Sequence, residues 1–291
     1  MRPETIRELA GPDLPRPVRE LAVAPPDVGS LHAFLPYLDV ALDVLQTPAA
    51  LTRAATELVE DWSRDGVVYG EVRFAPQLHT RAGLTLDEVV DAVAAGLAAG
   101  SAANGVRSGL LLCCLRHESP AVSLEVADTA VRRRDVVAGL DLAGDERQAG
   151  APHREAFELA HAGGVPVTVH AGEAAGPDSV WEALDVLGAR RIGHGVRCVG
   201  DAALVERLRR DRITLETCPR CNVLTRAVPG MAQHPVDRLL RAGLRVTVST
   251  DTRTTADTTL DEEFAALRTT FGWTEVEERR SQQHAAEAAF G

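Results

Sequence analysis

Hydrophobic and polar positions along this chain alternate between short apolar runs and stretches with helical spacing. Beyond residue 66, apolar runs of β-strand type recur at residues 67–75, 108–115, 136–142, 166–170, 191–193, 213–217 and 245–250. A helical stretch follows each run, and the clearest begins at Thr85, with Asp87 and Glu88 placed to complement the helix dipole. Strands that alternate with helices predict a parallel sheet with helical crossovers.

The first 66 residues have a different pattern. Residues 11–30 are rich in proline and predict an irregular loop, whereas residues 31–66 have helical apolar spacing. No strand is predicted before residue 66. Further along, Ser179 and Glu182 have the spacing of a capping box and predict the start of another helix.

Polar residues stand near the end of nearly every predicted strand, and this distinguishes two kinds of parallel fold. Examples are Glu71 and Arg73, His170 and Glu173, and Asp251. Functional groups at the carboxyl ends of successive strands are typical of a (β/α)₈ TIM-type barrel. A doubly wound, dinucleotide-binding sheet would instead have a glycine-rich phosphate-binding motif in the turn after its first strand, and this sequence lacks that motif. Seven strands are predicted where a barrel needs eight, so we expect the chain to enter the barrel after its first strand.

Charge and composition exclude several functions. The 291 residues include 31 basic and 42 acidic side chains, for a net charge of −11, and every basic one is arginine. The absence of lysine excludes Schiff-base chemistry, P-loop phosphate binding and metal bridges made by carbamylated lysine. The acidic balance argues against nucleic-acid and membrane partners, both of which need cationic surfaces.

Cysteine usage and the N-terminal residues indicate a reducing, cytoplasmic location. Five cysteines are too few for a disulfide scaffold in a chain of this length. The N-terminus lacks the apolar segment of a signal peptide, and no apolar run has the ~20 residues of a membrane span. We interpret Cys218 and Cys221, a lone CxxC pair, as structural.

Four residues that follow predicted strands have side chains suited to metal-assisted catalysis. His170 and Glu173 flank an Ala-Gly turn, His194 stands between two glycines, and Asp251 ends the last strand. An imidazole can bind zinc, and a buried carboxyl with a raised pKa can donate a proton. Because a barrel brings these strand ends to one mouth, we expect the four side chains to converge.

The chain resembles the adenosine deaminase family of zinc-dependent purine deaminases. The resemblance rests on motifs in family order along the whole chain, of which His-Ala-Gly-Glu and Gly-His-Gly are the most specific. They are residues 2–5, 71–76, 140–146, 170–173, 191–195, 218–219, 222–225 and 250–251. It implies one barrel domain over residues 1–291 and hydrolytic deamination of adenosine, or a related purine nucleoside, to inosine and ammonia.

The resemblance also implies roles for individual residues. His170 and Asp251 would be ligands of a single Zn²⁺, and Asp251 would also orient the metal-bound water. Glu173 would protonate the purine N1. His194 would either take a proton from the attacking water or steer it electrostatically. The backbone at Gly144 would hold the purine N3 edge.

Three positions depart from the family pattern. Its remaining zinc ligands form a His-x-His pair on the first strand, before the Arg-Pro-Glu-Thr segment, and no His-x-His occurs in this sequence. Thr252 stands where many members have an acidic or amide residue that contacts the purine N7. Cys221 stands where serine is commoner.

These departures leave alternatives to adenosine deamination. The start of the sequence could have been assigned too late or trimmed, so that the pair lies upstream. Alternatively, the chain is a degenerate barrel that binds purines or a protein partner without catalysis. A third reading is a deaminase of adenine or of an aminofutalosine-type nucleoside. Oligomeric state is not predicted.

Overall fold

A computed structural model describes residues 1–12 and 14–291. Its seven strands are all parallel and lie in chain order, in sheets of three and four strands. They are β1 (Tyr69–Phe74), β2 (Arg107–Leu115), β3 (Val137–Ala143), β4 (Thr168–Ala171), β5 (Arg191–His194), β6 (Thr214–Thr217) and β7 (Arg245–Val248). An isolated parallel bridge between Leu140 and Val167 joins the two sheets. All seven predicted strands are therefore confirmed.

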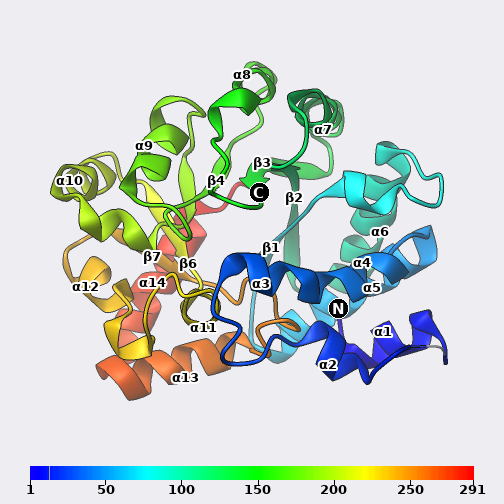
Figure 1. The fold of residues 1–291 in the computed structure, drawn as a ribbon, viewed down its shortest axis with the longest axis horizontal. Helices are drawn as coiled ribbons and strands as arrows, with labels where there is room; N and C mark the ends of the chain where they lie inside the picture. Colours follow the sequence, from blue (N-terminus) through cyan, green and yellow to red (C-terminus); the bar gives the residue numbers. More distant parts are fainter. Residues whose placement is uncertain (13) are drawn as a thin grey trace.

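Helices surround the strands, as expected for the parallel α/β fold of a TIM-type barrel (Figure 1). Pairing between β7 and β1 is not found within the described residues. The α-helices are α1 (Pro3–Ala10), α2 (Val18–Ala22), α3 (Leu31–Phe34), α4 (Asp39–Val44), α5 (Pro48–Arg64), α6 (Leu86–Asn104), α7 (Pro120–Arg132), α8 (Arg154–Ala162), α9 (Pro177–Asp185), α10 (Ala202–Arg210), α11 (Pro219–Leu224), α12 (Val236–Arg241), α13 (Leu260–Phe271) and α14 (Glu275–Ala288). Short 3-10 helices cover Leu35–Leu38, Pro76–His79, Ala151–His153, Val196–Gly200 and Met231–Gln233.

Three predictions of local structure need correction. The proline-rich segment 11–30 contains the short helix α2. The helical segment 31–66 is broken, because Pro36 falls in a 3-10 turn and Thr47 caps a new helix that starts at Pro48. The predicted capping box at Ser179 is wrong, since α9 already begins at Pro177, a residue type favoured in the first turn. The capping box at Thr85 is present.

The core lies between the strands and the surrounding helices. Leu140, Val169, Ile192, Leu215 and Val246 are completely buried. Helices α5 and α6 pack closely because α6 carries glycine at the contact, where a Cβ on Gly96 would collide with the backbone of α5. All five cysteines are free and buried.

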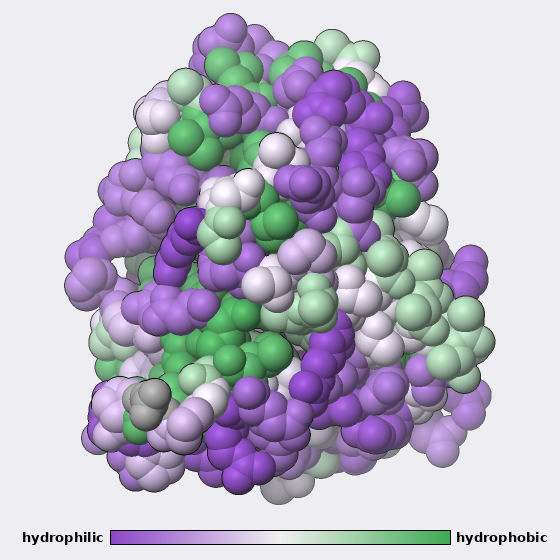
Figure 2. All heavy atoms as spheres, turned by 90° about the vertical axis from the view of Figure 1, so that its right-hand side faces the viewer, coloured by the Kyte–Doolittle hydropathy of each residue, from purple (hydrophilic) through white to green (hydrophobic). Residues whose placement is uncertain are grey.

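The outer surface seen from the α6 side is mainly hydrophilic, with smaller hydrophobic areas between the hydrophilic ones (Figure 2). Among residues 1–12 and 14–291, no helix combines the length and the apolar character needed to cross a bilayer.

Candidate active site

The side chains predicted to act in chemistry come from the carboxyl ends of three strands. His170 lies in β4, and Glu173 lies two residues beyond the end of that strand. His194 is the last residue of β5, and Asp251 follows β7. One ligand atom from each of His170, His194 and Asp251 lies within 4.8 Å of the others. The fold therefore brings two imidazoles and a carboxylate together at one mouth.

His170 is oriented by a buried carboxylate. Its Nδ1 lies 2.9 Å from Asp141 Oδ2, and Asp141 is completely buried in β3. Although burial favours its neutral form, the charges of His170 and Arg73 hold the pKa of Asp141 well below its usual value. The ionised carboxylate accepts the Nδ1–H, which leaves the Nε2 lone pair of His170 free for a ligand.

Asp141 is one member of a buried ion-pair network that runs through the strands. Arg73 in β1 pairs with Asp141 at 3.3 Å and with Glu216 in β6 at 2.7 Å. Arg191 in β5 pairs with the same Glu216 at 2.6 Å. These contacts join β1, β3, β5 and β6 and fix the carboxylate that orients His170.

Glu173 is in the environment expected of a proton donor. Its side chain is buried, and burial raises the pKa of this carboxyl above its usual value. Thr225 donates a hydrogen bond of 2.8 Å to Oε1, and Oε2 lies 3.5 Å from Nε2 of His194. A carboxyl that stays protonated nearer neutral pH is suited to general acid catalysis.

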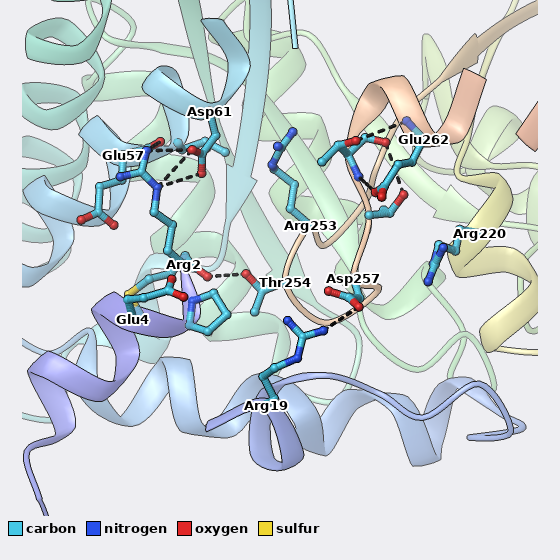
Figure 3. Close-up of a pocket in the computed structure, with 15 residues that line it drawn as sticks. Arg2, Glu4, Arg19, Glu57, Asp61, Arg220, Arg253, Thr254, Asp257 and Glu262 are labelled. Carbon is cyan, nitrogen blue, oxygen red and sulfur yellow. Dashed lines mark hydrogen bonds and ion pairs between the residues drawn. The ribbon is translucent and has the colours of Figure 1, made fainter. Parts of the chain in front are cut away.

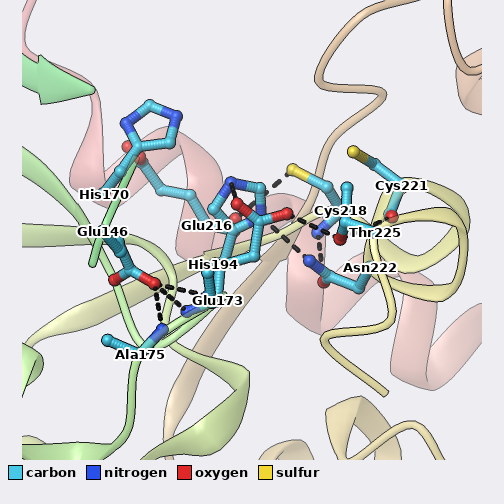
Figure 4. A network of polar contacts seen from close by, with 12 residues as sticks. Glu146, His170, Glu173, Ala175, His194, Glu216, Cys218, Cys221, Asn222 and Thr225 are labelled. Atoms are coloured by element: carbon cyan, nitrogen blue, oxygen red, sulfur yellow. Dashed lines mark hydrogen bonds and ion pairs between the residues drawn. The ribbon is translucent and has the colours of Figure 1, made fainter. Parts of the chain in front are cut away.

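The loop that carries Glu173 is held by a second glutamate. Oε2 of Glu146 accepts hydrogen bonds from the backbone N–H groups of Glu173, Ala174 and Ala175, at 2.9, 2.5 and 2.8 Å. Ser179 donates to the other oxygen of Glu146 and accepts from the N–H of Gly172. Figure 4 shows this carboxylate beside the backbone of Glu173 and Ala175.

His194 and Asp251 both have left-handed backbones, with φ of 61° and 57°. Residues with side chains adopt this region at a cost of about 1–3 kcal/mol, and such strain clusters at functional sites. Nδ1 of His194 lies 2.9 Å from Nδ2 of Asn222, at the end of a buried hydrogen-bond chain.

The two predicted substrate-binding residues lie near the same strand ends. Gly144 follows β3 with φ of 95°, and a Cβ added there would meet the ring of His117 at 3.3 Å. Thr252 follows Asp251, and its buried hydroxyl has no hydrogen-bond partner within the described residues. An unpaired buried hydroxyl costs free energy unless a ligand completes it.

His170 and Asp251 are two donors of the types that bind a divalent zinc ion. His170 offers a nitrogen whose other ring nitrogen is held by a carboxylate, an arrangement typical of zinc-binding histidines. Asp251 adds an oxygen ligand in the same cluster. Nitrogen and oxygen ligands of these types bind zinc in catalytic sites.

The CxxC cysteines lie at the edge of this site. Cys218 and Cys221 are buried, and burial raises the pKa of both thiols well above the usual value. Thiols of this kind are poor nucleophiles, which agrees with a structural interpretation.

A separate cavity of about 390 Å³ lies away from the four chemistry-bearing residues. It is lined by Arg2, Arg19 and Arg253 among others, and Figure 3 shows Arg2 beside Asp61 and Arg19 beside Asp257. Arg2 pairs with Asp61 and Arg19 with Asp257. Arg253 also pairs with Asp65, so these three arginines are already neutralised by the protein.

Residue patterns alone missed the supporting partners of the site. Asp141, Glu146, Asn222 and Arg73 fall within the matched motifs, but the sequence does not show that they support the catalytic side chains. His234 lies outside these motifs. The sequence feature that could have identified them is the presence of acidic and amide residues at the ends of apolar strands, where buried polar side chains need hydrogen-bond partners.

Histidine and carboxylate groups gathered at the carboxyl ends of parallel strands, next to a buried acid, are typical of hydrolases of the TIM-barrel class. The family model described as adenosine deaminase matches residues 1–291. The chain belongs to the adenosine deaminase family and is an aminohydrolase.

Individual relatives agree with this assignment. An adenosine deaminase of Mycobacterium ulcerans is 43% identical, in a match that covers 100% of this chain and 87% of the relative. The structure of an adenine deaminase from Arthrobacter aurescens superposes with a TM-score of 0.93 at 31% identity, covering 100% of this chain and 90% of that one. An amidohydrolase from Burkhoderia ambifaria, solved with bound Zn, has the same fold, with a TM-score of 0.89 at 22% identity and coverage of 100% and 82%.

Proposed function

We propose that this protein hydrolyses the 6-amino group of a purine, with adenosine as its preferred substrate, to give inosine and ammonia. The observation that carries the proposal is the cluster of His170, His194 and Asp251 beside Glu173, a buried carboxyl with a raised pKa. Family membership supports the reaction class, and the 43% identity to an adenosine deaminase favours the nucleoside.

His170, through Nε2, and Asp251, through its carboxylate, would hold a single zinc ion. When bound, zinc supplies a Lewis acid and an activated water nucleophile at neutral pH. The sequence contains no His-x-His pair to complete the family's ligand set. Zinc analysis of the purified protein measures directly whether the residues present suffice.

Glu173 would hold the proton that the reaction needs on the ring. As the oxygen of water bonds to C6 of the purine, the C6–N1 bond becomes single and Glu173 is placed to give its proton to N1. The proton that the water loses passes to the amino group, which leaves as ammonia, and the C6 hydroxyl proton returns to Glu173. Loss of ammonia from C6 then restores the ring as the carbonyl product. The N–H of Gly144 would bind the N3 edge, and the unpartnered hydroxyl of Thr252 would bind the ring at N7.

Adenine is a second candidate substrate, because the neighbour with a TM-score of 0.93 is an adenine deaminase. An aminofutalosine-type nucleoside is a third. Steady-state kinetics on all three, followed by ammonia release, would rank them, and we expect the highest kcat/KM for adenosine. The free, buried cysteines are consistent with a cytoplasmic location, which we include in the proposal.

The decisive variant is Glu173→Gln, which removes the transferable proton and keeps the shape of the side chain. We expect kcat to fall by about 10²–10⁴-fold while zinc content is unchanged. Glu155→Gln, at an exposed position of α8, is the matched control and should retain activity.

Loss of zinc together with activity in Glu173→Gln would contradict the assigned role. Purine binding without zinc and without ammonia release in the unmodified protein would instead favour a degenerate, non-catalytic barrel.

A further inference from the structure

Two buried side chains, those of Asn222 and His234, connect His194 to the backbone at the start of α12. Nδ1 of His194 lies 2.9 Å from Nδ2 of Asn222, and Oδ1 of Asn222 lies 3.1 Å from Nε2 of His234. All three residues are at most 3% exposed. A neutral histidine ring has one donor and one acceptor nitrogen, and an asparagine amide has a donor NH₂ and an acceptor oxygen. The direction of each hydrogen bond in this chain is therefore fixed by the bond next to it.

The chain begins at a donor whose direction is certain. The backbone N–H of Val236 donates to Nδ1 of His234 at 3.1 Å. A backbone amide cannot accept, so Nδ1 carries a lone pair and the proton of neutral His234 is on Nε2. Burial lowers the pKa of His234 to about 3, which keeps the ring neutral. Nε2 therefore donates to Asn222.

A second backbone donor fixes the amide of Asn222. The N–H of Cys218 lies 3.3 Å from the same Oδ1 that faces His234. Two donors on one atom identify it as the oxygen, so the NH₂ group of Asn222 faces His194. Because an amide NH₂ can only donate, Nδ1 of His194 accepts.

We infer that Asn222 and His234 are positioning residues that hold His194 as the neutral tautomer with its proton on Nε2. A proton on Nδ1, whether in the other tautomer or in the imidazolium, would face the NH₂ of Asn222, donor against donor. The Nε2–H points toward the site, 3.5 Å from Oε2 of Glu173.

This tautomer decides what His194 can do. A nitrogen that carries a proton has no lone pair, so Nε2 neither ligates a metal nor takes a proton from water, although His194 lies in the His170–Asp251 cluster. It is a hydrogen-bond donor, placed to stabilise negative charge on an attacking oxygen. The catalytic part of this inference rests on the proposed deamination, whereas the tautomer does not.

The test is to record ¹⁵N–¹H correlations of the histidine rings at about pH 8, well above the usual histidine pKa of about 6.5. The protein contains its own standards. Nε2 of His161 lies 2.9 Å from the carbonyl oxygen of Leu187, so it must donate and this ring is protonated on Nε2. Nδ1 of His79 lies 2.7 Å from the carbonyl oxygen of Leu45, so that ring is protonated on Nδ1. His194 is assigned by the signals lost in His194→Asn.

We expect the His194 pattern of the unmodified protein to match that of His161. A pattern like that of His79, or a doubly protonated ring, would overturn the inference. This result needs no substrate and no turnover, so it stands or falls separately from the proposed function.

Asn222→Asp provides the second arm. It retains an acceptor for His234 and for Cys218 N–H but presents an oxygen to Nδ1 of His194, so His194 should change to a ring protonated at Nδ1. If deamination is observed in the unmodified protein, kcat should fall by about 10²-fold while KM changes by less than about threefold. An unchanged kcat after a demonstrated change of tautomer would overturn the donor role.

Discussion

His170 and His194 stand on neighbouring strands, yet the protein holds them by opposite means. His170 is held by a charged partner, Asp141, which is tied to Arg73 and through it to Glu216. His194 is held by a neutral partner, Asn222, which is tied to His234.

The kind of partner determines which nitrogen carries the proton. A carboxylate accepts the Nδ1–H of His170 and leaves a lone pair on Nε2, as a metal ligand requires. An amide NH₂ donates to Nδ1 of His194 and leaves a proton on Nε2. Two identical side chains thus receive different chemistry from their neighbours.

The largest expected effect concerns His234, which supports His194 through Asn222, and the dependence of protein stability on pH. Below about pH 6.5 the unfolded chain protonates this histidine, whereas folded His234 remains neutral down to about pH 3. The unfolded state then binds more protons, so the free energy of unfolding falls as pH decreases, by up to about 5 kcal/mol across this window.

Urea unfolding at about pH 7.5 and about pH 5 would measure the first part of this dependence, about 2 kcal/mol at about 1.4 kcal/mol per pH unit below 6.5. We expect a smaller loss on acidification in His234→Asn than in the unmodified protein, and no such difference in the exposed control His32→Asn. Equal losses in all three proteins would show that His234 is not held neutral.

On the side of His170, the largest loss of stability is expected when the charge of Asp141 is removed. Asp141→Asn leaves Arg73 without one of its buried partners, and breaking a buried ion pair costs about 3–5 kcal/mol. Zinc affinity should fall by about 10–100-fold, because the amide orients His170 less strongly. Unfolding free energy and a zinc titration measure the two effects.

Asp135→Asn is the control for this change, because its side chain is 69% exposed and should cost little. If Asp141→Asn were no more destabilising than this control, the charged network would not hold His170 as described.

A smaller effect is expected at Glu146, which holds the loop that carries Glu173. Glu146→Gln replaces a charged acceptor of three backbone N–H groups, and we expect a loss of about 1.5–3 kcal/mol in the free energy of unfolding. Ammonia release should fall as well, since Glu173 is less firmly placed. Glu155→Gln is again the control, and matching activities in the two variants would rule out a positioning role.

The sequence predicted the strands well because each is a short apolar run of its own, bounded by polar residues. It failed at Ser179, whose spacing with Glu182 indicated a helix cap, because both side chains have tertiary partners instead. Ser179 bonds to Gly172 and Glu146, and Glu182 accepts from the backbone of Gly150 and Ala151. Local spacing cannot distinguish a cap from a long-range contact.

Taken alone, the sequence determined the seven parallel strands, the family, and the presence of His170, Glu173, His194 and Asp251 at strand ends, since these depend on local pattern. Only the tertiary structure decided which polar groups meet. Asp141 reaches His170 across 29 positions and Asn222 reaches His194 across 28. A hydrogen bond depends on distances of a few tenths of an ångström and on the direction of each donor. These distances and directions are set when the strands pack side by side. They place the ring proton on Nδ1 in His170 and on Nε2 in His194, although both residues are histidine.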